Sequence, residues 1–336
     1  SPTVADDMTL LALTEKSLNY CLQAVFSYSM LWHFEHNPGK SGILVFNETK
    51  FERERNRQNQ NRKFKLGNNY IPEKESYTHV GVEIHIDGVV KEGIQNRICK
   101  ARRALNAMTG LGIREGGINP LTASKMYKAI CLPIMLFGSE VWILRKKEMD
   151  SLGVAHRQAA RRIQSLPTKA ANAGVLATLG WLTIESEIAI KKLCYCGSLL
   201  RLPATSRERQ LFVSHLYLYR CGANRLCHTI TGTIIKYLCS YQLMDTVMEI
   251  LDLGRVFPSK LIWKSEVKRK VAQVDNQEWK CAVMNSTKLA IFREVVYEVK
   301  QHPWWVFARQ YAMFLKCVNT MMKLIFGEHC LNVNSG

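Results

Sequence analysis

The chain has 336 residues, 47% of them hydrophobic, and a formal net charge of +18. This length and composition are sufficient for a sizeable core and exclude a largely disordered chain. The excess of Lys and Arg indicates an anionic partner, with nucleic acid as the first candidate and an acidic membrane surface as the second. No apolar run reaches the length of a membrane span, since Ala129 to Phe137 is too short and contains Pro133.

Eleven Cys residues occur without regular spacing and without a signal peptide. Free thiols in a reducing compartment explain this usage better than a disulfide framework. We therefore expect an intracellular protein, nuclear or cytoplasmic, that is not secreted.

Two adjacent carboxylates, Asp6 and Asp7, lie between short apolar stretches near the start of the sequence. The pattern predicts a strand–turn–strand hairpin that presents the acids at its tip. Clustered carboxylates hold Mg²⁺ in enzymes that transfer phosphoryl groups, but an Asp-Asp pair is also common in solvated turns. Neighbouring side chains of a strand point to opposite faces, so both acids can serve one metal only if the turn re-aims one of them.

Helical spacing of apolar residues from Thr14 predicts a helix that ends at Trp32. A turn at Pro38-Gly39 then leads to Lys40 and to an apolar strand at 42–46. Residues 47–69 are rich in Arg, Lys, Asn and Gln and lack apolar periodicity, which predicts a mobile loop, either solvated or in contact with phosphates.

Residues 77–86 alternate as a strand, and Gly81 within it indicates a close approach to the backbone. From Lys91 to Leu111 the periodicity predicts an amphipathic helix, and a second helix is expected from Asn119-Pro120 to a kink at Pro133. A third helix is expected over 146–166, and residues 179–202 are interpreted as a helical hairpin.

Two of these helices carry Arg and Lys outside their apolar faces. The predicted nucleic-acid-binding residues are Arg97, Lys100, Arg103, Arg157, Arg161 and Arg162. Such faces position a duplex by its backbone without recognising its sequence, although a solvated helix face has the same pattern.

Beyond Pro203, helical periodicity recurs at 234–253, 262–274, 289–299 and 305–322. Cys221, Cys227, His228 and Cys239 match no regular zinc finger, so zinc binding is not expected. Trp304, Trp305 and Tyr311 have the spacing of core residues, with stacking on bases as the alternative.

Several short motifs occur in a specific order: Ala5-Asp6-Asp7, Asn37-Pro38-Gly39-Lys40, His79-Val80-Gly81 and Gly138-Ser139-Glu140-Val141-Trp142. Over about residues 1 to 200, this series resembles the second half of a reverse transcriptase from a LINE-type (non-LTR) retrotransposon. The resemblance implies an α+β fold in three parts: the end of the palm at 1–88, a helical thumb at 89–202 and a helical extension at 203–336.

The resemblance also implies functional roles. Asp6 and Asp7 would be catalytic Mg²⁺ ligands, and Lys40 would be the catalytic donor of a proton to leaving pyrophosphate. His79, Val80 and Gly81 would form the primer grip, although the family usually has Tyr-Leu-Gly there. The full-length enzyme would use an RNA template, a DNA primer and dNTPs.

The third catalytic Asp of the family would lie upstream of residue 1, so we expect that this chain does not polymerise DNA by itself. Two alternatives stay open. One is a non-catalytic, basic helical module that binds RNA or DNA, and the other is a decayed transposon copy. The absence of the family's complete Cys-x-x-Cys…His…Cys zinc knuckle, of which Cys317, His329 and Cys330 remain, is compatible with decay.

Overall fold

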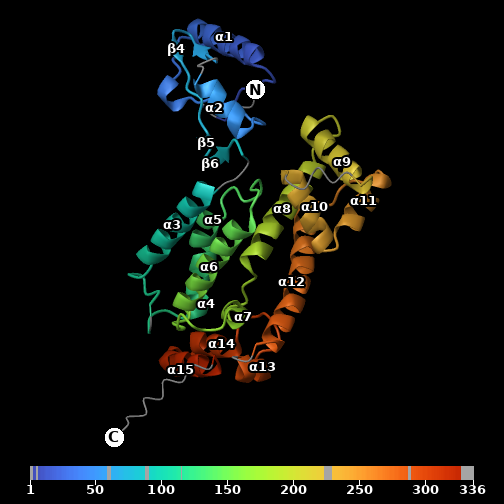
Figure 1. Cartoon of the computed structure of the whole chain (residues 1–336). Helices are drawn as coiled ribbons and strands as arrows, with labels where there is room; N and C mark the ends of the chain where they lie inside the picture. The colour runs from blue at the N-terminus through green and yellow to red at the C-terminus, as the bar shows by residue number, and fades with distance from the viewer. Residues whose placement is uncertain are drawn as a thin grey trace. The chain divides into compact units, whose positions relative to one another are not determined.

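The computed structural model describes residues 3–4, 7–58, 62–87, 91–114, 116–222, 229–286 and 289–326. The chain divides into two compact units, Ser1–Gly93 (unit 1) and Ile94–Gly336 (unit 2). Helices dominate, and the described strands pair only in short antiparallel sheets, which confirms the α+β class (Figure 1). No helix among the described residues is long and apolar enough to span a bilayer. The predicted boundary between residues 202 and 203 stays a prediction.

Unit 1 begins with the predicted hairpin. Strands β1 (Thr3–Val4) and β2 (Asp7–Met8) pair antiparallel, with Val4 opposite Asp7. Helix α1 (Glu15–Leu31) follows, and its N-cap Thr14 accepts a hydrogen bond from the Ser17 amide at 3.1 Å. This cap satisfies one of the free amides of the first turn and confirms the predicted start of the helix.

A short 3₁₀ turn, η1 (Pro38–Lys40), stands where the turn was predicted. The strand predicted at 42–46 is wrong, because only Ile43 forms a bridge, parallel to Glu73. The core of unit 1 is small, and its buried apolar residues are Leu22, Ile43, Phe64, Leu66 and Ile71.

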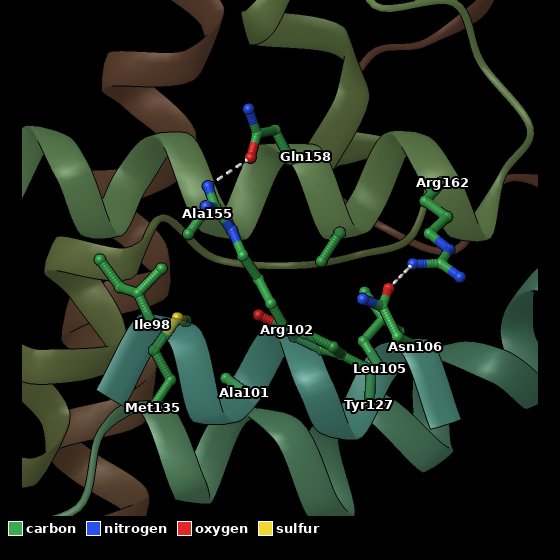
Figure 2. A pocket seen from close by; sticks show the side chains of 11 residues that line it. Ile98, Ala101, Arg102, Leu105, Asn106, Tyr127, Met135, Ala155, Gln158 and Arg162 are labelled. Carbon is green, nitrogen blue, oxygen red and sulfur yellow. Dashed lines mark hydrogen bonds between the residues drawn. The ribbon is translucent and has the colours of Figure 1, made fainter. Parts of the chain in front are cut away.

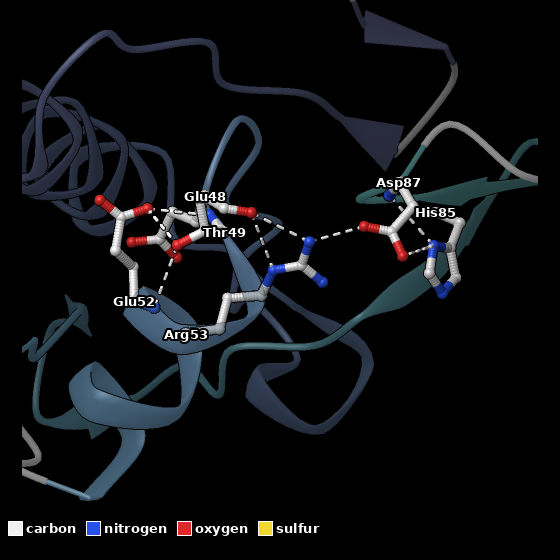
Figure 3. A network of polar contacts seen from close by, with 6 residues as sticks. All are labelled: Glu48, Thr49, Glu52, Arg53, His85 and Asp87. Carbon is white, nitrogen blue, oxygen red and sulfur yellow. Dashed lines mark hydrogen bonds and ion pairs between the residues drawn. The ribbon is translucent and has the colours of Figure 1, made fainter.

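The loop predicted at 47–69 contains regular structure. Helix α2 (Lys50–Gln58) is followed by the hairpin of β3 (Lys65–Leu66) and β4 (Asn69–Tyr70). Polar contacts stabilise the start of α2, where Glu52 Oε2 accepts from both the amide and the hydroxyl of Thr49 at 2.8 Å (Figure 3). These hydrogen bonds hold the pKa of the Glu52 carboxyl below its usual range.

Arg53 extends the same network. It donates to the Glu48 carbonyl at 3.0 Å and to Asp87 Oδ1 at 2.6 Å (Figure 3). The bond from Arg53 lowers the pKa of Asp87. The apolar pattern failed here because charged side chains, rather than a buried apolar face, hold this helix in place.

The single strand predicted at 77–86 is a hairpin. Strands β5 (Ser76–His79) and β6 (Val82–His85) pair antiparallel, with His79 opposite Val82. The turn residues Val80 and Gly81 both have positive φ angles, +48° and +74°. Two successive left-handed residues form the tight turn that matches the twist of hairpin strands. The alternation of apolar residues continues through this turn, so it did not indicate where the first strand ends.

The three helices predicted after residue 90 are present, and all but the first three residues of the first one belong to unit 2. Helix α3 spans Lys91–Ala107, α4 spans Pro120–Met126 and α6 spans Lys146–Ile163. The predicted apolar face of α3 is buried, and its members are Ile94, Ile98, Ala101, Leu105 and, just past the helix end, Met108.

The chain stays helical through Pro133. A π-helical segment, η2 (Tyr127–Cys131), links α4 to α5 (Leu132–Met135), and the Leu132 amide donates to the Tyr127 carbonyl. The wider π turn accommodates a residue without a backbone N–H, so the predicted kink becomes a local widening.

The remaining helices of unit 2 follow in chain order. They are α7 (Asn172–Ala177), α8 (Ile184–Leu200), α9 (Arg207–Arg220), α10 (Ile230–Ser240), α11 (Met244–Asp252), α12 (Lys260–Met284), α13 (Ala290–Val295), α14 (Pro303–Gln310), the 3₁₀ turn η5 (Ala312–Phe314) and α15 (Leu315–Ile325). The helical hairpin predicted at 179–202 is therefore one helix, α8, that begins after a loop.

Helix α8 is central to unit 2, because it packs against both α6 and α12 (Figure 1). At the α6 side, Trp181 stacks on Tyr127 with ring centres 4.5 Å apart. At the α12 side, α8 contributes Leu193 and Cys196 to a large buried cluster that also receives residues of α9, α10 and α11. Trp305 is fully buried, as the core interpretation of its spacing predicted, but Tyr311 is 46% exposed, so that interpretation is wrong for Tyr311.

Candidate nucleic-acid interface

A groove separates α3 from α6 in unit 2. Its walls are apolar side chains of both helices, including Ile98 and Leu105 of α3 and Ala155 of α6, around a pocket of about 180 Å³ (Figure 2). The groove continues past Ile98 into an open hollow of about 620 Å³, which Lys146 and Lys147 also line.

Arginines line the rim of this groove. Arg102 of α3 reaches across to Gln158 of α6 with a hydrogen bond of 2.8 Å (Figure 2). Arg162 of α6 donates in the opposite direction, to Asn106 and Thr109. These bonds tie the two helices together and orient guanidinium groups along the rim.

The predicted basic residues of α3 differ in their surroundings. Lys100 and Arg103 are exposed and lie on the side of α3 opposite its buried face. The guanidinium of Arg97 lies 4.6 Å from the ring centre of Phe137, a cation–π contact that holds this side chain against unit 2.

The predicted cluster on α6 is more enclosed. Arg157 and Arg161 are half-buried. Arg161 donates to the Ala170 carbonyl at 2.8 Å and to the Asn172 side chain, so it fixes the loop before α7. Burial lowers the pKa of Arg161. Arg162 joins α6 to α3, as described above.

Sequence reasoning missed Arg102, Lys146 and Lys147. Arg102 directly precedes Arg103 in the sequence, and Lys146 and Lys147 begin α6. Arg102 directly follows the buried Ala101, and helical geometry places it at the edge of the apolar face of α3. The sequence could therefore have assigned it to the rim.

Unit 1 has a separate pocket of about 400 Å³ near the carboxylate hairpin. Its walls are mostly apolar, and its polar members include Asp7, Ser41, Tyr77 and His79. His79 Nε2 lies 3.4 Å from Thr9 Oγ1, a contact that joins β5 to the segment after β2. Asp7 is exposed, and Asp6 lies outside the described residues.

The other described residues predicted at this site, Lys40, Val80 and Gly81, do not line the pocket. Lys40 has an exposed side chain, and its backbone carbonyl accepts a hydrogen bond from the Tyr77 hydroxyl. Val80 and Gly81 form the β5–β6 turn. Of the predicted catalytic and primer-grip residues that are described, the pocket thus brings together Asp7 and His79.

The described residues do not make a complete metal centre. Within them, no group of three or more His, Cys, Asp or Glu side chains is placed to hold an ion. Asp7 alone does not fit Mg²⁺, which takes six oxygen ligands, so no chemical step through a metal is derived. Cys227, His228, His329 and Cys330 lie outside the described residues, while Cys221, Cys239 and Cys317 are exposed.

Comparisons with protein-family models, with curated proteins and with solved structures found no match to this chain.

Proposed function

We propose that the chain is the palm-and-thumb portion of a LINE-type reverse transcriptase, an RNA-directed DNA polymerase. In this proposal unit 2 holds the duplex of RNA template and DNA primer by its phosphates. The observation that carries the proposal is the set of cations along α3 and the α3–α6 groove. The exposed members of this set are Lys100, Arg102, Arg103, Lys146 and Lys147.

The chemistry of these side chains supports backbone binding. Each cation that neutralises a phosphate releases condensed counterions, which favours binding and makes it depend on salt. Three cations, Arg102, Lys146 and Lys147, line the open hollow together with one acid, Asp150. Positive charge therefore prevails there. Contacts from Lys and Arg to phosphates carry no sequence information, so binding without sequence preference is expected.

A matched pair of variants tests this surface. Lys100→Gln combined with Arg103→Gln removes two exposed cations of α3, and Lys236→Gln combined with Lys316→Gln removes two exposed cations elsewhere in unit 2. Anisotropy titrations of a labelled RNA–DNA hybrid over a salt series measure the slope of log K against log salt. We expect the α3 variant to lower its magnitude by about 2 and the control variant by less than about 0.5. Equal losses would contradict the assignment of the surface.

The polymerase part of the proposal has a separate test. A primer–template with a recessed DNA 3′ end, dNTPs and Mg²⁺ is incubated with the purified chain, and primer extension is followed. We expect the chain to bind without extending, because its described residues lack a complete metal centre. Extension that Asp6→Asn abolishes would contradict that expectation and would assign the metal to the hairpin.

A non-catalytic nucleic-acid-binding module is the second candidate function. The observation that favours it is that the basic groove lies wholly in unit 2, whereas the carboxylate hairpin lies in unit 1. Tighter binding to a recessed primer end than to a blunt hybrid would favour the reverse transcriptase, and equal binding would favour the module.

A further inference from the structure

Helices α8 and α12 approach each other closely in unit 2. The indole Nε1 of Trp263 on α12 donates to the Leu193 carbonyl on α8 at 2.7 Å, and Arg201 donates to the Pro258 carbonyl at 3.2 Å. A Cβ atom at Gly197 would lie 2.3 Å from Trp263 Cδ1. The two helices therefore form one fixed surface along their line of contact.

Three lysines follow one another along this surface. Lys260, Lys264 and Lys268 are exposed and recur every four residues of α12. With a rise of 1.5 Å per residue, neighbouring members are about 6 Å apart along the helix axis and the row is about 12 Å long. We call these lysines, together with Arg201 at the end of α8, the α8–α12 cation row.

Cys194 of α8 lies near the row and responds to its charge. Cys194 is a half-buried residue of α8, and burial raises its pKa. Lys264, Lys268, Arg201 and Lys260 all lower this pKa, so the four cations lie within electrostatic range of one thiol.

The lysines of the row form no ion pair with an acid in the part of the chain that the structure describes. Glu266 on α12 is bound by Arg269 at 2.9 Å. Glu187 on α8 interacts electrostatically with Lys268, and no ion pair between the two is formed among the described residues. Within the described parts of the chain, no carboxylate lies within 4 Å of the ammonium groups of Lys260, Lys264 or Lys268.

We propose that the α8–α12 cation row binds the phosphate backbone of the nucleic acid that unit 2 holds, as a second contact surface beside the α3–α6 groove. This inference rests on the proposed function. One strand of a duplex carries a phosphate charge about every 3.4 Å of helix axis, so a row of about 12 Å spans about three or four phosphates. Lysines act as point charges on flexible stems, which suits backbone contacts rather than recognition of bases.

Matched triple variants test the row. Lys260→Gln/Lys264→Gln/Lys268→Gln removes it, and Lys125→Gln/Lys236→Gln/Lys316→Gln removes three exposed lysines of other helices with the same change in net charge. In titrations of an RNA–DNA hybrid, we expect the row variant to lower the magnitude of the salt slope by about 3. The control variant should lower it by less than about 1, because its lysines contact no phosphate.

The outcomes separate the two proposals. A wild-type chain that binds no nucleic acid would overturn the proposed function and this inference with it. A wild-type chain that binds normally, with equal slopes for the two triple variants, would overturn the inference alone. If the row variant lost binding to phosphatidylserine vesicles but bound the hybrid as the wild type does, the inference would also be overturned and the row would be assigned to a membrane surface.

A measurement on the wild-type chain tests the row without depending on the folding of variants. Exposed amines are acetylated with and without the hybrid, and the modified lysines are quantified by mass spectrometry. We expect at least a fivefold protection of Lys264 and Lys268 and none of Lys236. Unchanged acetylation of Lys264 and Lys268 in the complex would contradict the proposal.

Discussion

At the scale of single residues, Gln164 is the centre of a buried polar network in unit 2. Its Oε1 accepts from the Thr178 hydroxyl at 2.6 Å and from Trp305 Nε1 at 3.1 Å. Its Nε2 donates to the carbonyls of Val175 at 2.8 Å and Ala160 at 3.2 Å. One amide thus joins the end of α6 to α7 and to α14, which is far away in the sequence.

Removal of this amide should destabilise unit 2 strongly. Gln164→Ala leaves the indole N–H of Trp305 and the hydroxyl of Thr178 without their acceptor in a buried environment. An unsatisfied buried polar group costs about 1 to 3 kcal/mol, so we expect the free energy of unfolding to fall by about 3 kcal/mol in urea denaturation. Gln277→Ala, which removes an exposed amide of α12, should change it by less than about 0.5 kcal/mol. Equal effects would contradict the network.

Two buried histidines make unit 2 sensitive to acid. His156 Nε2 donates to the Leu182 carbonyl at 3.2 Å and its Nδ1 accepts from the Tyr127 hydroxyl at 3.0 Å, an arrangement that requires a neutral ring. His302 Nδ1 accepts from the Trp304 amide at 3.2 Å. Burial lowers the pKa of His156 to about 3 and that of His302 to about 4.

The sign of the pH effect follows from these shifts. At a pH between the folded pKa and about 6.5, each histidine is protonated in the unfolded chain but neutral in the folded chain. The contribution of the neutral rings to stability is therefore fully present above pH 6.5 and is lost as the pH falls towards 4. His302→Asn retains a helix-capping side chain but removes the titration. Below pH 6, the free energy of unfolding should fall less steeply for this variant than for the wild type, by up to about 1.4 kcal/mol per pH unit. Parallel curves of unfolding free energy against pH would refute this role of His302.

At the scale of elements, the crossing of α8 and α12 depends on Gly197. A methyl group there would lie 2.3 Å from Trp263 Cδ1 and 2.6 Å from its Nε1. Gly197→Ala improves helix propensity by about 1 kcal/mol but forces the helices apart, which costs more because the core is closely packed. We expect a net loss of about 2 kcal/mol in chemical denaturation.

Gly110 provides the control for this substitution. A Cβ at Gly110 would meet its nearest neighbour, the Ala107 carbonyl oxygen, at 4.0 Å. Gly110→Ala should therefore leave stability within about 0.5 kcal/mol of the wild type. If Gly197→Ala were equally neutral, the close crossing of α8 and α12 would not be correct.

The elements that could be predicted from sequence are those with a local cause. The start of α1 at Thr14 and the start of α4 after Asn119 follow from capping residues, and the buried face of α3 follows from apolar spacing. Helix α2 and the hairpin β5–β6 were missed for different reasons. Polar contacts hold α2, and the turn at Val80-Gly81 depends on positive φ angles that no apolar pattern encodes.

The candidate site was predictable to a similar degree. Periodicity alone places Lys100 and Arg103 on the outer face of α3, because they lie off its apolar stripe. The enclosed contacts of Arg161 and Arg162 depend on segments brought together by folding, such as Asn172 and Asn106, and could not be predicted. The α8–α12 cation row needs the packing of two helices that are about sixty residues apart in the sequence.

At the scale of the whole molecule, the two units differ in how much apolar surface they bury. Unit 1 has a small core and exposes large apolar side chains of and near α1, among them Tyr20, Leu31 and Trp32 at 64% or more. Unit 2 buries a large cluster around α8 and α12 and carries both proposed phosphate-binding surfaces. We therefore propose that unit 2 binds the duplex, and its larger core holds the cationic helices in place.

The most direct test of this account is a titration of the wild-type chain with an RNA–DNA hybrid and with the corresponding single strands over a salt series. We predict preference for the hybrid and a salt slope of magnitude above about 4, as expected when at least five cations contact phosphates. Failure to bind, preference for single strands, or a slope near zero would contradict the central claim that unit 2 holds a duplex by its backbone.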